Sequence, residues 1–190
     1  MGVSQPIDRS RLHRRVSFAH LIGRLVRSMN LIAPLLSPDN VLVDLDASSK
    51  KRVFEQAGLI FENNQSIGRS VVFDSLFARE RLGSTGLGQG VAIPHGRIKG
   101  LKDATGAVIR LSTPIPFDAP DGKPVSLLFV LLVPEQATEH HLQLLSELAQ
   151  LFSDSAFRER VAEATDAAAV HALFTTWGAA HAADQRRAAL

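Results

Sequence analysis

The chain is organised around one stretch, residues 79–97, which reads Arg79-Glu80-Arg81-Leu82-Gly83-Ser84-Thr85-Gly86-Leu87-Gly88-Gln89-Gly90-Val91-Ala92-Ile93-Pro94-His95-Gly96-Arg97. Four glycines precede a short apolar run that leads to a single histidine. Glycine lets the backbone approach an anion closely, and successive N–H groups of such a loop can form an anion-binding nest. Because Pro94 fixes φ and favours extended backbone in the residue before it, we expect His95 to lie at the end of a strand and to be held in place.

The imidazole of His95 is a candidate nucleophile for a negatively charged group, because three arginines of the same stretch lie close to it in sequence. Composition alone leaves a simpler interpretation open, in which a glycine-rich turn carries a surface histidine. The stretch lacks the Gly-Lys-Ser/Thr of a Walker loop and the glycine spacing of a dinucleotide fingerprint. A zinc site built from His95, His140 and His141 is disfavoured, because arginine is near and no thiolate or ordered carboxylate partner accompanies these residues.

The run from Arg79 to Gly96 resembles the active-site segment of the IIA components of the bacterial phosphoenolpyruvate-dependent sugar phosphotransferase system, in its mannitol/fructose type. It is most similar to the nitrogen-regulatory branch, the nitrogen-type enzyme IIA, and the opening Met29-Asn30-Leu31-Ile32-Ala33-Pro34-Leu35-Leu36-Ser37-Pro38 resembles that branch more weakly. The resemblance covers roughly residues 29–177. It implies that His95 accepts a phosphoryl group from a histidine phosphocarrier protein of the HPr/NPr type and that Arg79 contacts this group. It suggests Nε2 as the reacting nitrogen, which the residues themselves do not reveal.

A second pair of histidines, His140 and His141, lies in the first turn of a predicted helix, where free N–H groups and the helix dipole stabilise anions. Matched to the family pattern, the second active-site histidine is His141, because it precedes Leu142 of the predicted apolar stripe. Neighbours on a helix diverge by about 100°, so the two cannot serve one site equally. Without the resemblance, both would read as solvated first-turn residues.

The glycine-rich segment supplies the remaining candidates. Its hydroxyl groups can donate to phosphoryl oxygens or merely shape the turn, and its N–H groups can do the same. The residues expected to contact phosphoryl oxygens or to support the loop are Ser84, Thr85, Gly86, Gly88 and Gly90. No metal and no cofactor are expected.

Hydrophobic patterning predicts an α/β fold. Strands are predicted at residues 41–46, 104–112 and 125–133, and helices from Ser49 to Asn63, from 69 to 81, from Thr138 to 152, from 154 or 155, and from 166 to 177. Gly83 is expected as the C′ residue of the second helix. Strands mixed with helices predict a single domain with a mixed central sheet and helices on both faces.

Charge is unevenly distributed along the 190 residues. Residues 1–28 carry six arginines and one acidic residue, a local charge of +5, whereas residues 29–190 carry 15 basic and 18 acidic residues, a charge of −3. We therefore expect a basic extension at 1–28, with a short amphipathic helix at 18–26, then a IIA domain at 29–178 and a tail at 179–190. A mildly acidic domain argues against nucleic-acid binding. The apolar run 127–133 is too short for a membrane span, and no secretory signal is visible, which predicts a cytoplasmic protein.

Three hypotheses for the function remain open. The chain has no cysteine, so it cannot carry the phosphocysteine of a mannitol- or fructose-type IIB module, and we expect a freestanding IIA. The nitrogen-type resemblance implies a regulator whose phosphorylation state selects its targets, such as potassium transporters or sensor kinases. The alternatives are a sugar-transport IIA that passes phosphate to a separate IIB, and a binding module whose histidine no longer reacts.

Overall fold

The computed structural model describes residues 30–136 and 139–187, with side chains as far as Gly178. Residues 31–177 form one compact unit, and Asn30 and residues 178–187 belong to a second. The predicted basic extension, its amphipathic helix and the predicted cap Thr138 lie outside the described residues.

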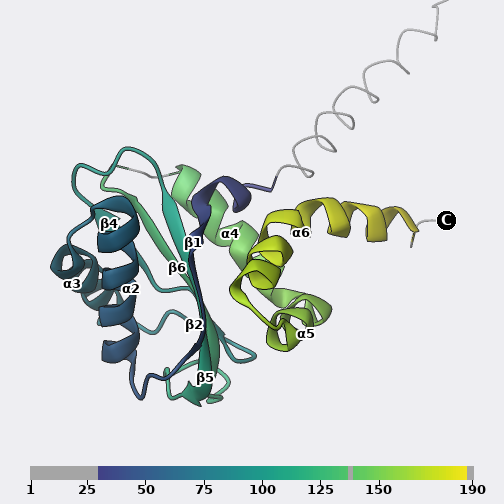
Figure 1. Cartoon of the computed structure of the whole chain (residues 1–190), viewed down its shortest axis with the longest axis horizontal. Coiled ribbons are helices and arrows are strands. Elements are labelled where there is room, and N and C mark those ends of the chain that lie inside the picture. Colours follow the sequence, from purple (N-terminus) through teal and green to yellow (C-terminus); the bar gives the residue numbers. More distant parts are fainter. Residues whose placement is uncertain (1–29, 137–138, 188–190) are drawn as a thin grey trace, which may run out of the picture. The chain divides into compact units, whose positions relative to one another are not determined.

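One six-stranded sheet forms the centre of the compact unit (Figure 1). In spatial order it comprises β1 (Leu36–Leu45), β5 (Thr105–Ile115), β6 (Val125–Pro134), β3 (Val91–Ala92) and β2 (Gly86–Gly88), while β4 (His95–Ile98) also pairs with β6. The β1–β5, β3–β6 and β4–β6 pairs are parallel, and the β5–β6 and β2–β3 pairs are antiparallel. The sheet is therefore mixed, as predicted.

Strand β6 is the central strand that its apolar sequence predicts. It lies between β5 on one side and β3 with β4 on the other, and residues 127–133 are buried on both faces. The other two predicted strands are longer than expected: β1 begins at Leu36, and β5 continues through Pro114 to Ile115. The β5–β6 register shifts between Arg110 and Ile115, and such an irregularity accommodates a proline inside a strand.

Helices cover both faces of the sheet, which confirms the predicted architecture (Figure 1). One face packs against α2 (Lys50–Gln65) and α3 (Arg69–Glu80), and the other against α4 (Glu139–Ser153), α5 (Ser155–Glu163) and the first turns of α6 (Ala167–Arg187). A short 3-10 helix, Ala33–Leu35, precedes β1. Its Leu35 joins the hydrophobic core on the face that α4, α5 and α6 cover.

Helices α2 and α3 begin where the sequence predicts, but their last residues differ from the prediction. Ser49 caps α2 as predicted, with its side chain accepting from the Arg52 N–H, but the helix runs on to Gln65. Helix α3 ends at Glu80 with Arg81 as its cap, so Gly83 is not the C′ residue; it follows two positions later with φ +145°.

Candidate active site

His95 is the first residue of β4, at the strand end that the sequence predicts. Strands β3 and β4 both run parallel to β6, and Ile93 and Pro94 separate them. The Pro94 carbonyl still accepts a hydrogen bond from the Leu131 N–H at 2.9 Å. The proline thus interrupts the strand without detaching it from the sheet, and the histidine follows on a fixed backbone.

Both ring nitrogens of His95 have partners. Nδ1 lies 2.9 Å from the carbonyl oxygen of Ile93, which can only accept, so Nδ1 carries the proton. Nε2 then holds the lone pair, and the Nε–H of Arg79 donates to it at 3.1 Å. This arrangement fixes one tautomer and leaves Nε2 as the basic, nucleophilic atom of the half-buried ring.

Arg79 reaches His95 because α3 lies close to β4. Nη1 of Arg79, in the last turn of α3, also donates to the Gly83 carbonyl at 3.0 Å, which spreads the guanidinium between the ring and the loop. Ser75 Oγ donates to the Arg97 carbonyl at 2.9 Å. A Cβ on Gly96 would collide with the Ser75 side chain, so glycine at this position permits the helix to approach the strand.

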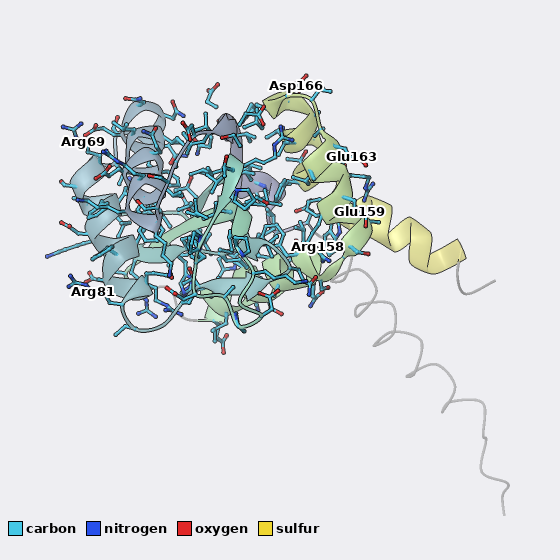
Figure 2. All side chains as sticks on the ribbon, turned by 90° about the horizontal axis from the view of Figure 1, so that it is seen from below. Arg69, Arg81, Arg158, Glu159, Glu163 and Asp166 are labelled. Atoms are coloured by element: carbon cyan, nitrogen blue, oxygen red, sulfur yellow. The ribbon has the colours of Figure 1, made fainter. Side chains whose placement is uncertain are left out.

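Arg81 and Arg97 do not join this contact. Arg81 lies with its guanidinium carbon 4.8 Å from the centroid of the Phe77 ring, and its side chain is on the outside of the molecule (Figure 2). Arg97 is exposed, and its Nη1 donates to the Glu135 carbonyl at 3.4 Å.

His141 faces His95 from the first turn of α4. The two ring centroids are 5.4 Å apart, with 66° between the ring planes. His141 is only 8% exposed, and its Nε2 is buried without a hydrogen-bond partner among the described residues. His140 is exposed, so the structure brings only one of the two histidines to His95.

The sequence argument that selected His141 was wrong in its premise. Leu142, the leucine it relied on, is 67% exposed, and the apolar face of α4 is formed by Leu144, Leu148, Leu151 and Phe152. His141 itself occupies an inward position of that face.

Burial and nearby positive charge keep both imidazoles neutral. Burial lowers the pKa of His95; the bond to the Ile93 carbonyl raises it in opposition, and the Arg79 charge lowers it further. Burial likewise lowers the pKa of His141, and the proximity of His95, Arg97 and Arg79 adds to the effect. Since an ordinary histidine has a pKa of about 6.5, these lowered pKa values favour the uncharged form of both rings at pH 7.

The glycine-rich segment is held by bonds of its own. Ser84 Oγ donates to the Phe117 carbonyl and accepts from the Gly86 N–H at 3.1 Å. The Thr85 hydroxyl and N–H donate to the carboxylate of Glu80 at 2.6 and 3.1 Å. Both hydroxyls therefore bond to partners other than the His95 ring. Of the two roles expected for them, these contacts fit support of the loop.

The three candidate glycines, Gly86, Gly88 and Gly90, pack against neighbouring strands and loops. Gly86 and Gly88 belong to β2, and a Cβ on Gly88 would come within 3.1 Å of the Asp121 carboxylate. The carbonyl of Gly90, where φ is +77°, accepts from the Ser126 and Leu127 N–H groups. Close packing and a left-handed backbone thus account for glycine at Gly88 and Gly90.

Sequence reasoning missed Glu80, which bonds to Lys50 and to the glycine-rich segment. One signal was present in the sequence. A carboxylate in the last turn of a helix lies at the negative end of the helix dipole, which is unfavourable and indicates a compensating partner. Its partner Lys50 lies 30 residues earlier, and no periodic pattern reveals a contact at that separation.

The described residues contain no cluster of three side chains suited to a metal ion, and none of their helices is both long and apolar enough to cross a membrane.

Comparison with known proteins identifies the family. The family model for the phosphoenolpyruvate-dependent sugar phosphotransferase system, EIIA 2, matches residues 34–177. A nitrogen regulatory protein from Pseudomonas aeruginosa is 46% identical over 140 residues, which cover 73% of this chain and 91% of the relative. The crystal structure of nitrogen regulatory protein IIA-Ntr from Neisseria meningitidis is 55% identical, with a TM-score of 0.72, over 76% of this chain and 99% of that one.

A more distant structure shares the fold. Mannitol IIA from Escherichia coli has a TM-score of 0.62 at 21% identity, and the match covers 73% of this chain and 98% of that one. Together with the family model and the nitrogen-regulatory relatives, this confirms the resemblance that the sequence suggested. The chain belongs to the EIIA 2 family of the phosphoenolpyruvate-dependent sugar phosphotransferase system.

Proposed function

We propose that this protein is a regulatory phosphocarrier, which accepts a phosphoryl group on Nε2 of His95 from a histidine phosphocarrier protein. The observation that carries the proposal is the ring geometry of His95. Nδ1–H is bound to the Ile93 carbonyl, so Nε2 carries the lone pair, which accepts from the Arg79 Nε–H in the absence of a phosphoryl group. A neutral ring with a fixed tautomer is what nucleophilic attack by imidazole requires.

The transfer exchanges one N–P bond for another. The Nε2 lone pair attacks phosphorus, and the P–N bond of the donor's phosphohistidine breaks, its electron pair returning to the donor's ring nitrogen. No proton has to move, because Nδ1–H remains on the Ile93 carbonyl. Arg79, whose Nε–H gives up its bond to Nε2, then donates to a phosphoryl oxygen, a charge-assisted bond.

His141 supplies a second donor. Its Nε2 is buried beside the acceptor ring and has no partner among the described residues, and in the neutral tautomer protonated at Nε2 it can donate to another phosphoryl oxygen. The first turn of α4 adds the positive end of a helix dipole. The phosphoryl oxygens thus meet donors that lie beside the acceptor ring before the group arrives.

Regulation follows from charge at a surface suited to protein contact. Leu82, three residues after Arg79, and Leu142, next to His141, are 85% and 67% exposed. Phosphorylation adds a charge of about −1.5 to −2, which is enough to create or abolish an interface. Potassium transporters and sensor kinases are the targets that the family resemblance favours. A cytoplasmic location is a further prediction of this function.

The test is intact-mass spectrometry after incubation with phosphoenolpyruvate, enzyme I and the cognate phosphocarrier. We expect wild type to gain one acid-labile phosphoryl group and His95→Ala to gain none while keeping its circular dichroism spectrum. His140→Ala, which alters an exposed neighbour of the site, should be labelled like wild type. A wild type that stays unlabelled beside a charged carrier would refute the proposal.

Sugar transport is the less favoured function, because the relatives at 46% and 55% identity are nitrogen regulatory proteins and mannitol IIA is only 21% identical. The labelled protein should therefore keep its phosphoryl group when mixed with purified mannitol- or fructose-type IIB. Rapid discharge to either one would favour the transport function instead.

A further inference from the structure

Glu80 is a nearly buried carboxylate beside the site that the proposed transfer does not use. Its side chain is 8% exposed, although it lies at the C-terminal end of α3, where the helix dipole disfavours a negative charge. Both carboxylate oxygens are engaged. Oε1 is 2.7 Å from Lys50 Nζ, and Oε2 accepts from the N–H and hydroxyl of Thr85.

Lys50 anchors this carboxylate from the neighbouring helix, α2. Its Nζ also lies 2.8 Å from the carboxylate of Asp118 and 4.6 Å from the centroid of the Phe117 ring. The Lys50 side chain is 20% exposed, so the Glu80 ion pair is largely shielded from water. Removal of one partner would leave a mostly buried charge, which explains why both are held by further contacts.

A continuous chain of contacts links Glu80 to the acceptor ring. The Thr85 N–H donates to Glu80, the Thr85 carbonyl accepts from the Ile93 N–H at 3.0 Å, and the Ile93 carbonyl accepts from His95 Nδ1–H at 2.9 Å. Each residue in this series of hydrogen bonds is thereby held by the next. The position of the Ile93 carbonyl, which selects the His95 tautomer, depends on where Glu80 holds Thr85.

Glu80 also acts on His95 through its charge. The Glu80 carboxylate raises the pKa of His95, while burial and the Arg79 guanidinium lower it. Adjacent residues on α3 thus exert opposite electrostatic effects on the same ring. The basicity of Nε2 reflects the balance between them.

We infer that Glu80, anchored by Lys50, is a positioning residue that holds His95 in the tautomer whose Nε2 lone pair faces Arg79. It acts through Thr85 and Ile93 and does not touch the reacting atoms. The inference rests on the proposed function for its effect on transfer, but its effect on the ring can be measured without any phosphoryl donor.

The test compares the full chain with Glu80→Gln, Thr85→Val and the control Glu62→Gln. Glu62 accepts from the backbone N–H of Arg69 at the other end of α3, so the control neutralises a carboxylate that accepts from a backbone N–H far from the ring. Proton–nitrogen correlation spectra of the imidazoles report the tautomer, pH titration reports the pKa of His95, and rapid quench with charged phosphocarrier reports transfer.

In Glu80→Gln we expect a mixture of His95 tautomers, a lower pKa of His95, and a transfer rate that falls up to about 100-fold while KM for the carrier stays unchanged. Thr85→Val, which deletes only the hydroxyl contact, should show a smaller change of the same kind. Glu62→Gln should match wild type in all three measurements.

Wild-type tautomer and transfer in Glu80→Gln would overturn the inference and leave the proposed function intact. If wild type is never labelled but Glu80→Gln still changes the tautomer, the proposed function fails and the positioning role stands. Should Glu80→Gln fail to fold, Thr85→Val decides the matter, because an unchanged tautomer and rate in that variant would also overturn the inference.

Discussion

The two histidines of the site are held in opposite ways. His95 has a partner on each ring nitrogen, the Ile93 carbonyl on Nδ1 and the Arg79 guanidinium on Nε2. His141 is more deeply buried, yet its Nε2 has no partner among the described residues. One ring is fixed by hydrogen bonds, and the other by the packing of α4.

This difference corresponds to two chemical tasks. An acceptor needs its tautomer fixed before the donor arrives, whereas a group that stabilises the arriving charge needs an unoccupied donor. A buried polar atom without a partner is unfavourable by about 1–3 kcal/mol, so it marks a place where a partner is expected. In the proposed reaction, a phosphoryl oxygen becomes that partner for His141.

Loss of the Arg79 guanidinium should have the largest effect, because it removes the partner of His95 Nε2. Arg79→Lys keeps the charge but cannot reach both the His95 ring and the Gly83 carbonyl, because lysine lacks the planar fork of arginine. We expect phosphoryl transfer to slow about 100- to 1000-fold, the effect of losing one preorganised donor. Rapid-quench labelling measures the rate.

Arg81→Lys is the matched control for this change. Arg81 stacks on Phe77 and lies on the outside of α3, so its substitution should leave the rate within about twofold of wild type. Equal losses in the two variants would mean that general positive charge, and not the contact of Arg79, supports transfer.

His141→Ala tests the second histidine, which we propose as a donor to a phosphoryl oxygen. Loss of one hydrogen bond to a charged group corresponds to about 1.5–3 kcal/mol, so we expect transfer to slow about 10- to 100-fold. His141→Gln, which keeps an N–H donor, should recover part of the rate. His140→Ala should behave as wild type in the same labelling assay, and a loss confined to His140→Ala would reverse the assignment.

The sequence predicted the parts of the site that lie close together in the chain. The glycine-to-histidine stretch indicated His95 and Arg79, and the alternation of strands and helices indicated the mixed sheet. It failed on the face of α4, because a buried polar residue takes a position where the pattern expects a leucine. His141 points inward and Leu142 outward, so the predicted stripe was displaced in the first turn.

Contacts between distant parts of the chain were not predicted from the sequence. Lys50 bonds to Glu80 across 30 residues, and Asp121 bonds to Gln89 across 32. Hydrophobic periodicity reports which face of an element is buried, but it carries no information about which polar side chain meets which loop. The first contact depends on how α2 packs beside α3, and the second on how two loops meet.

Acid should weaken the fold through both histidines. Their pKa values are lowered in the folded state, so the unfolded chain binds protons first as the pH falls below about 6.5. The two histidines therefore do not reduce the free energy of unfolding well above that pH. As the pH falls from there toward the pKa values of the folded state, the free energy of unfolding decreases. Each unit of difference in pKa corresponds to about 1.4 kcal/mol.

Urea unfolding of wild type and His141→Gln at several pH values between 7.5 and 5 measures this effect. His141→Gln should lose less stability on acidification than wild type. Burial raises the pKa of Glu147, which acts in the opposite direction, but it is present in both proteins and cancels from the difference. Parallel pH dependence in the two proteins would mean that the pKa of His141 is the same in the folded and unfolded states, which would contradict the prediction.

The smallest effect is expected at the tip of the glycine-rich segment. The exposed Asp121 carboxylate accepts from the N–H groups of Gln89 and Lys123, at 2.8 and 3.1 Å, and these bonds lower its pKa. Asp121→Asn leaves one acceptor oxygen for two donors, so amide exchange at Gln89 should become faster, whereas the exposed Asp103→Asn should not change it. The transfer rate should stay within about twofold of wild type, because the contacts from Glu80 to Thr85 hold the His95 side of the segment independently of its tip. A large loss of transfer in Asp121→Asn would mean that the tip and the acceptor ring move as one unit, and the separation between a fixed acceptor and a tolerant loop would then have to be abandoned.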